Sequence, residues 1–182
     1  MHLVKNKYYH FYNRSNNKEV VFKENRNYLY FLIKYRKYLS NFVNTICYCL
    51  MPDHFHFLIK IVSEETDQIK TNIGILLSSY TKAINKSFNW TGSLFQEHTK
   101  AKLVEDEEYM WKLINYIHQN PLRKGLVDKI NEWEFSSYKD LAGLRNGSLV
   151  DRSLYKTKFN SENEFRFFSS SKIEKFDYMF GD

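Results

Sequence analysis

The sequence predicts an α+β fold in which the elements follow the order β-α-β-β-α-β, with a further helix added after them. Short stretches rich in aromatic and β-branched residues are separated by longer segments in which apolar residues recur at helical spacing. Two of the short stretches flank a Met-Pro-Asp turn at 51–53, which indicates a hairpin. This order is that of the ferredoxin-like split βαβ arrangement, an antiparallel sheet in which the first and third strands are central.

The first half of the chain provides three of the expected strands and one helix. Residues 8–14 alternate aromatic and polar side chains, as a strand does. A helix is expected over 25–42, where four apolar residues fall at roughly helical spacing: Leu29, Leu32, Ile33 and Leu39. Residues 43–51 are apolar and rich in β-formers, and residues 54–62 return after the turn. We expect these last two stretches to pair with each other.

The second half provides two helices and one strand. A helix is expected over 66–88 because the segment opens on polar capping residues and continues with helical periodicity. Residues 92–104 are interpreted as the fourth strand. The added helix is expected over 105–120, where an acidic opening suits the positive end of the helix dipole. Pro121 is expected to end it, because proline lacks the N–H that a helix interior needs.

The chain is expected to form one main domain over 1–140 and a short extension over 141–182. Trp133 and Phe135 alternate in a Trp-Glu-Phe-Ser-Ser-Tyr stretch and are interpreted as residues that cap the core. The extension is polar and aromatic, and we expect it to hold one or two short helices.

Composition favours a protein that binds nucleic acid. Among 182 residues, 43% are hydrophobic and 18% are aromatic, and the net charge is +6. Cations bind phosphates and exposed rings stack on bases, although a merely lysine-rich protein has the same charge balance. Cys47 and Cys49 are too close in sequence to form a disulfide framework, so a reducing cytoplasm is expected. No apolar run reaches membrane-spanning length, and we expect no secretory leader because the first residues contain no long apolar stretch.

Two histidines, His54 and His56, stand one residue apart inside an otherwise apolar strand. Residues i and i+2 of a strand share a face, so both imidazoles are expected to face the same side. They are either two ligands of a metal ion with open coordination positions or two half-buried packing residues. Together with Cys47 and Cys49 they could instead form a closed zinc site, but small thiols in an apolar strand are more often core.

The added helix places a phenol and an amide on one edge. Tyr116 and Asn120 are four residues apart and therefore lie together on one flank of its apolar stripe, while His118 falls on the opposite flank. A tyrosine can act as a covalent nucleophile where a cation stabilises its phenolate. Tyr116 could equally be one of many tyrosines that border the core.

Four motifs together resemble one family. The stretches Tyr-Cys-Leu-Met-Pro-Asp-His-Phe-His-Phe-Leu-Ile, Gly-Ser-Leu-Phe-Gln-Glu-His, Tyr-Ile-His-Gln-Asn-Pro-Leu-Arg-Lys-Gly-Leu-Val and Trp-Glu-Phe-Ser-Ser-Tyr are similar to those of the HUH single-tyrosine transposases. The branch that the chain resembles best is the repeat-associated tyrosine transposases, and the likeness covers roughly residues 5–140. The histidine run and the Tyr-Ile-x-x-Asn-Pro run are specific in combination, whereas either alone is weak.

The resemblance implies a role for each residue that matches a motif. His54 and His56 would bind a divalent metal, Mg²⁺ or Mn²⁺, Tyr116 would be the nucleophile, and Asn120 would complete the metal site. The chain departs from the pattern at two positions. Asp53 stands where asparagine is common, and His98 stands where arginine is usual, so a DNA contact at His98 is expected to be weaker or sensitive to pH.

The implied reaction cleaves and rejoins single-stranded or hairpin DNA through a 5′-phosphotyrosine. Basic side chains near the motifs are expected to contact the DNA backbone, together with His98: Arg14, Lys100, Lys102, Arg123 and Lys124. The extension adds further basic residues that could do the same: Arg145, Arg152, Lys156 and Lys158. Such a protein is expected in the cytoplasm near the nucleoid, and the resemblance leaves open whether it acts as a monomer or a homodimer.

Two other functions remain open at the level of sequence. An RNA-recognition module has a similar aromatic-rich sheet, and in it the two histidines and Tyr116 would be incidental. A metal-dependent phosphoesterase would use water as the nucleophile, and Tyr116 would only position the substrate.

Overall fold

The computed structural model describes residues 2–171, and within that range four strands form one antiparallel sheet in the order β2-β3-β1-β4. This is the arrangement that the sequence predicts, with the first and third strands in the centre. The elements in chain order are β1 (Tyr8–Arg14), α1 (Asn25–Leu39), β2 (Val43–Leu50), β3 (His54–Ile61), α2 (Thr66–Phe88), β4 (Lys100–Val104), α3 (Glu107–Arg123), α4 (Tyr138–Leu141), α5 (Ser153–Lys158) and α6 (Glu162–Ser170).

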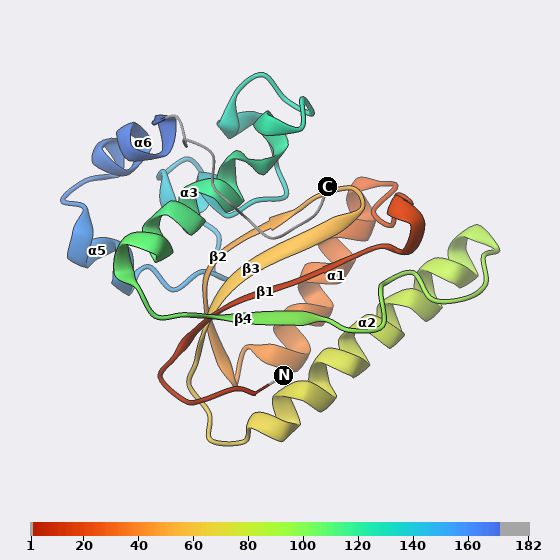
Figure 1. The fold of residues 1–182 in the computed structure, drawn as a ribbon. Coiled ribbons are helices and arrows are strands. Elements are labelled where there is room, and N and C mark those ends of the chain that lie inside the picture. The colour runs from red at the N-terminus through yellow and green to blue at the C-terminus, as the bar shows by residue number, and fades with distance from the viewer. Residues whose placement is uncertain (1, 172–182) are drawn as a thin grey trace.

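The two faces of the sheet carry different helices. Helices α1 and α2 cover one face, and α3 lies on the other, with α5 and α6 outside it (Figure 1). Phe11, Phe55 and Phe57 are fully buried. The rings of Phe55 and Phe57 lie close to Phe31 of α1, and the ring of Phe11 packs against Phe55. Because strand side chains alternate between faces, this aromatic layer leaves the other face of β1 and β3 to polar residues. The core therefore lies mainly between the sheet and the α1–α2 pair.

Helix α3 is held between the sheet and the C-terminal helices. Leu113, Ile114 and Ile117 are fully buried, as the predicted apolar stripe requires. On its outer side the indole of Trp111 packs edge-to-face against Tyr155 of α5 and Phe168 of α6. The two short helices expected in the extension are thus present, and they cover α3. Residues 172–182 of the predicted extension lie outside the described residues.

The buried face of α1 differs from the predicted one. Leu29 and Ile33 are 55% and 65% exposed, whereas Tyr28, Phe31 and Tyr35 are buried. The helix carries two candidate stripes, one aliphatic and one aromatic, and the aromatic stripe makes the larger contact with Phe22, Phe57 and Tyr80. Of the four residues predicted to face the core, Leu39 is buried and Leu32 is partly buried.

The fourth strand is shorter than predicted. It spans Lys100–Val104, and residues 92–99 form an irregular segment beside the end of β1. Asparagine side chains take over hydrogen bonds in this segment: Asn16 Nδ2 donates to Ser93 O at 2.9 Å, and Asn13 Nδ2 donates to Gln96 O at 3.0 Å. Because asparagine side chains bind these carbonyl groups, the backbone of residues 92–99 does not form the regular hydrogen-bond ladder of a strand.

Helix α3 runs past the proline that was predicted to end it. Pro121 lies inside the helix, which continues to Arg123, and Lys124 N donates to Asn120 O at 3.0 Å. Proline removes one backbone hydrogen bond but does not by itself force the last turn to unwind. The extra turn places Arg123 on the same helix as Tyr116.

Arg145, one of the basic residues expected near DNA, makes a set of structural hydrogen bonds. Its Nε and Nη2 atoms donate to the two carboxylate oxygens of Asp140 at 2.7 and 2.9 Å, and Asp140 is 2% exposed. Nη1 and Nη2 also donate to the carbonyls of Glu134 and Ser136, both at 2.7 Å. The guanidinium group of Arg145 thus links the segment that follows α4 to the segment that precedes it.

Replacing Arg145 by alanine is expected to lower the free energy of unfolding by about 3 kcal/mol, because it leaves a buried carboxylate unpaired. This expected loss is at the lower end of the range for buried ion pairs because the Arg145 side chain is 32% exposed. Urea denaturation measures the change in the free energy of unfolding. The control is Arg26→Ala, which removes an exposed pair with Glu24 and is expected to cost about 0–1 kcal/mol. Equal losses in the two variants would contradict the assignment.

None of the helices within the described range has both the length and the hydropathy that a membrane-spanning segment requires.

Candidate active site

The pleat of β3 places His54 and His56 on the face that α3 covers. Their rings lie 5.0 Å apart between centroids and are nearly perpendicular, at 82°. The His54 side chain is 17% exposed, whereas His56 is 3% exposed. Burial and the neighbouring charges of His54 and His10 lower the pKa of His56 well below its ordinary value, so it is neutral at pH 7. Neutral imidazole is the form that binds metals.

Asp53 orients His54. Its Oδ1 atom lies 2.6 Å from His54 Nδ1, so the hydrogen bond occupies that nitrogen and leaves Nε2 pointing elsewhere. Burial opposes ionisation of Asp53, but the hydrogen bond and charge of His54 outweigh it and hold the pKa of this carboxyl below its usual value. A carboxylate behind a histidine is a common support for a metal ligand. The departure at Asp53 noted from sequence thus acquires a physical role.

His10 is a member of the site that the sequence reasoning missed. It is fully buried on β1, and its Nε2 atom lies 3.0 Å from His56 Nδ1. Burial, followed by the charge of Lys102, lowers the pKa of His10 to about 3. The alternation of residues 8–14 already placed His10 on one face with Tyr12 and Arg14. Which residue of β3 it meets depends on strand register, and sequence alone does not give the register.

Helix α3 brings Tyr116 and Asn120 to the histidines. Its first turn is capped by Asp106, which accepts a hydrogen bond from Tyr109 N. The ring of Tyr116 lies 6.1 Å from that of His56, in an edge-to-face arrangement. His118, on the opposite flank, is buried with Nε2 at 2.8 Å from Ser137 Oγ. His118 therefore lies away from the histidine pair and cannot take the place of Asn120 there.

Six of the predicted residues line one cavity of about 230 Å³. They comprise one phenol, two imidazoles, one amide and two cations: Tyr116, His54, His56, Asn120, Arg14 and Lys124. Arg123 lies just beside it, with its guanidinium carbon 5.2 Å from the centre of the Tyr116 ring. Lys18 and Asp53, not predicted as site residues, also contribute to the walls.

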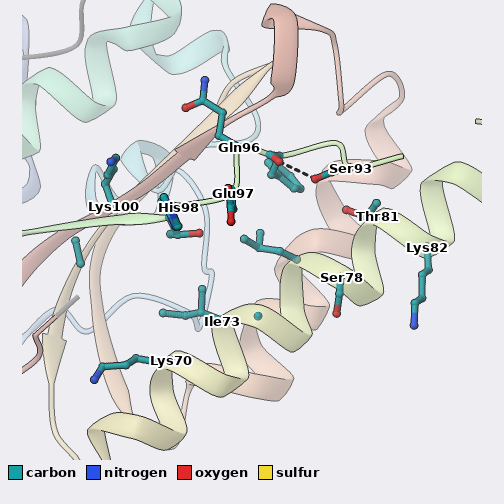
Figure 2. A pocket seen from close by; sticks show the side chains of 15 residues that line it. Lys70, Ile73, Ser78, Thr81, Lys82, Ser93, Gln96, Glu97, His98 and Lys100 are labelled. Atoms are coloured by element: carbon teal, nitrogen blue, oxygen red, sulfur yellow. Dashed lines mark hydrogen bonds between the residues drawn. The ribbon is translucent and has the colours of Figure 1, made fainter. Parts of the chain in front are cut away.

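The other three predicted residues lie away from this cavity. Lys100 and Lys102 stand opposite Tyr12 and His10 in the β1–β4 register, and the Lys102 ammonium is 5.5 Å from the Tyr109 ring centre. His98 lines a separate groove against α2 together with Lys100, whereas Lys102 does not line it (Figure 2). His98 lies outside the strand because β4 begins at Lys100.

The residues present fit a divalent metal with open coordination positions. Asn120 is 2% exposed, and its Nδ2 atom has no hydrogen-bond partner among the described residues. The two ends of an amide exchange by rotation, so this position can present an oxygen to a cation. Two imidazoles and one amide make three donors. Within residues 2–171 no three His, Cys, Asp or Glu side chains form such a group, and the amide of Asn120 is the further donor that lines the cavity with the two histidines.

The two cysteines are core residues. Cys47 and Cys49 are fully buried free thiols, and burial raises the pKa of both. Cys49 stands opposite His56 in the β2–β3 register, with Sγ at 3.8 Å from Met51 Sδ. The described side chains accordingly provide no closed zinc site that combines the thiols with the histidines.

Residues 3–120 match the family model described as "Transposase IS200 like". The chain belongs to this transposase family. The match spans His10, His54, His56, Tyr116 and Asn120 and ends at the last of them. The resemblance inferred from the motifs is therefore confirmed.

Two known members are similar to this chain. A protein of Haemophilus influenzae named for the REP-associated tyrosine transposases is 26% identical over 103 residues, which are 52% of this chain and 58% of the relative. The chain thus matches little more than half the length of that curated relative. A solved structure of a REP-associated tyrosine transposase bound to a REP hairpin superposes with a TM-score of 0.64 at 18% identity. The superposition covers 84% of this chain and 93% of that one. This likeness confirms the fold.

Proposed function

We propose that this transposase-family protein cleaves and rejoins single-stranded DNA through a 5′-phosphotyrosine formed on Tyr116. The observation that carries the proposal is the cavity in which Tyr116, the two histidines and Asn120 meet. The residue types in this cavity support the proposal: a candidate nucleophile, candidate metal donors on a strand and a helix, and cations in the wall.

The metal donors in this proposal are His54, His56 and Asn120. A divalent cation bound there supplies charge neutralisation at a phosphate oxygen, which favours in-line attack. Asp53 and His10 hold the two imidazoles in position through the Nδ1 atoms. Because both hydrogen bonds use the Nδ1 atoms, the Nε2 atoms of His54 and His56 are the ones that would coordinate the cation.

In the proposed reaction the Tyr116 oxygen attacks the phosphorus atom of the scissile phosphodiester. A bond forms between that oxygen and phosphorus, the bond from phosphorus to the 3′ oxygen breaks, and the phenolic proton is lost. The leaving 3′ oxygen takes up a proton. A 3′-hydroxyl from another strand can reverse the step and restore a phosphodiester without an external energy source.

Positive charge at the cavity supports both the phenolate and the substrate. Arg123 lies over the Tyr116 ring, and Arg14 and Lys124 are in the cavity wall. Charges of this sign stabilise a developing phenolate and bind the flanking phosphates. The solved structural neighbour is bound to a REP hairpin. We therefore propose that the substrate of this chain is a hairpin with single-stranded flanks.

A denaturing gel of end-labelled single-stranded hairpin DNA, incubated with the protein and Mn²⁺, tests the proposal. A band that carries both label and protein supports a tyrosine intermediate. Free cleaved product with no adduct would support the phosphoesterase with water as nucleophile. Binding without either product would support a recognition module.

His10 provides a prediction about the metal site. If His56 binds a cation through Nε2, its Nδ1 keeps a proton and donates it to His10 Nε2. Replacing His10 by leucine removes the acceptor and is expected to weaken Mn²⁺ binding by about 10–100-fold, as loss of such supports does elsewhere. Titration calorimetry measures the affinity.

The matched variant is His10→Gln, whose amide oxygen can accept the same proton. It is expected to retain more of the Mn²⁺ affinity than His10→Leu at similar thermal stability. If leucine and glutamine weaken binding equally, packing rather than the hydrogen bond explains the role of His10.

A further inference from the structure

A second hollow lies on the opposite side of β4 from the nucleophile. It is a groove of about 880 Å³ between α2 and residues 93–101, and it shares no lining residue with the cavity around Tyr116 (Figure 2). One wall is a row on α2 with a residue at every fourth position: Lys70, Gly74, Ser78 and Lys82. Residues i and i+4 of a helix stand one above the other, so these four form a single stripe.

The centre of this stripe is recessed. Gly74 has no side chain, and a Cβ atom built there would meet no atom within 4 Å. Ser78 is short, whereas a lysine stands at each end of the row. By helical rise the two lysines are about 18 Å apart along the axis. The result is a channel with a recessed middle and a lysine at either end, of which Lys70 also forms an ion pair with Asp67.

The opposite wall has matching chemistry. Lys100 and His98 lie along it, and hydroxyl groups come from Ser93 and Thr99. Glu97 is the single carboxylate among the described residues that line the groove. Lysines and hydroxyls are the side chains that contact phosphate oxygens. Phe95 is 3% exposed, so its ring is not available for stacking on bases. Ile73, Leu77 and Ala101 add apolar surface between these groups, so it is the charged and hydroxyl side chains, rather than the whole wall, that suit a polyanionic backbone.

Hydrogen bonds at the end of β1 join the walls of the groove and of the cavity. Asn13 lines the cavity, and its Nδ2 atom donates to Gln96 O at 3.0 Å and to Thr99 Oγ1 at 2.9 Å, both on residues of the groove. Arg14, also in the cavity wall, accepts a hydrogen bond at its carbonyl from Gln96 N at 2.9 Å. The segment that forms one wall of the groove is therefore held directly to two residues of the cavity wall.

We infer that this groove holds the single-stranded DNA arm that flanks the cleavage position, through contacts with its phosphates. The inference rests on the proposed function for its substrate and adds a second binding site to it. About 18 Å accommodates about five stacked nucleotides at about 3.4 Å each, and fewer if the strand is extended. Affinity is expected to rise as a single-stranded tail lengthens and to level off once the tail fills the groove.

The experiment is fluorescence anisotropy with labelled hairpin DNA that carries no tail, a short tail, or a tail longer than the groove. In Lys70→Ala, Lys82→Ala the gain from the long tail is expected to disappear, while the tailless hairpin binds as it does to the wild type. The slope of log affinity against log salt for the long-tailed DNA is expected to decrease by about 1.4, or about 0.7 for each lost phosphate contact.

Two further variants separate charge from shape. Lys34→Ala, Lys37→Ala removes the same charge from α1 and is expected to leave the tail-dependent gain unchanged. Gly74→Phe fills the recess without changing charge and is expected to abolish the gain, with thermal unfolding showing that the fold is retained. If Lys70→Ala, Lys82→Ala and Gly74→Phe keep the wild-type dependence on tail length, the groove does not hold the DNA arm.

Failure of this inference is distinguishable from failure of the proposed function. Covalent adduct formation is measured on short-tailed DNA, which does not reach along the groove. Loss of the tail-dependent gain with normal adduct formation supports both proposals. A wild-type protein that forms no adduct at all but shows the tail dependence and its loss in the variants retains the groove and overturns the tyrosine chemistry.

Discussion

Tyr116→Phe is expected to abolish covalent attachment to DNA and strand cleavage together, and to leave the fold and metal binding nearly unchanged. Phenylalanine has no oxygen with which to attack phosphorus, so the loss should be complete. Loss of a mere positioning hydrogen bond would cost only about 1–3 kcal/mol, or about tenfold to a hundredfold in rate. Denaturing gels with end-labelled hairpin DNA and peptide mapping of any adduct measure the difference.

The matched control is Tyr109→Phe, on the same helix two turns before the site. It removes a phenol near Lys102 that does not line the cavity, and it is expected to keep adduct formation. Cleavage by Tyr116→Phe at a tenth of the wild-type rate would show that water is the nucleophile. An adduct mapped to another tyrosine would preserve the chemistry and move it elsewhere.

The second large effect is expected from the histidine pair. His54→Ala, His56→Ala should remove Mn²⁺ binding, because it deletes two of three donors. Its effect should exceed the roughly 10–100-fold loss expected where only a support such as His10 is removed. Calorimetric titration measures the affinity, and circular dichroism measures retention of the fold.

Because His56 is buried, the single variant His54→Ala gives the cleaner measurement: His54 is partly exposed, and its loss leaves the His10–His56 hydrogen bond in place. His2→Ala serves as the control, because His2 is exposed and distant in sequence from the motifs. Unchanged Mn²⁺ affinity in the double variant would place the metal site elsewhere.

The sequence predicted much of the site because its signals are local. The alternation along His54–Ile61 gives a shared face to two histidines, and a four-residue interval gives a shared flank to Tyr116 and Asn120. Neither observation shows that the strand face and the helix flank meet. The family motifs supplied that link, and the structure brings six of the predicted residues to one cavity.

What the sequence could not predict depends on contacts between distant segments. His10 reaches His56 only through the β1–β3 register. Helix α1 offered two apolar stripes, and local periodicity does not say which one meets Tyr80 and Phe57. The start of β4 depends on Asn13 and Asn16, amides from 80 or so residues earlier that bind its preceding carbonyls. In each case the deciding partner is remote in the chain.

The alternation on β3 also limits how this chain can vary. His54 and His56 face the cavity, while Phe55 and Phe57 between and after them are fully buried in the aromatic layer on the other side. A one-residue insertion or deletion at the start of β3 would reverse both sets at once, turning the imidazoles into the core and the phenyl rings into the cavity. Insertions and deletions are therefore tolerated in the loops after β3. Between Met51 and the strand, by contrast, the number of residues has to stay the same for His54 and His56 to face the cavity.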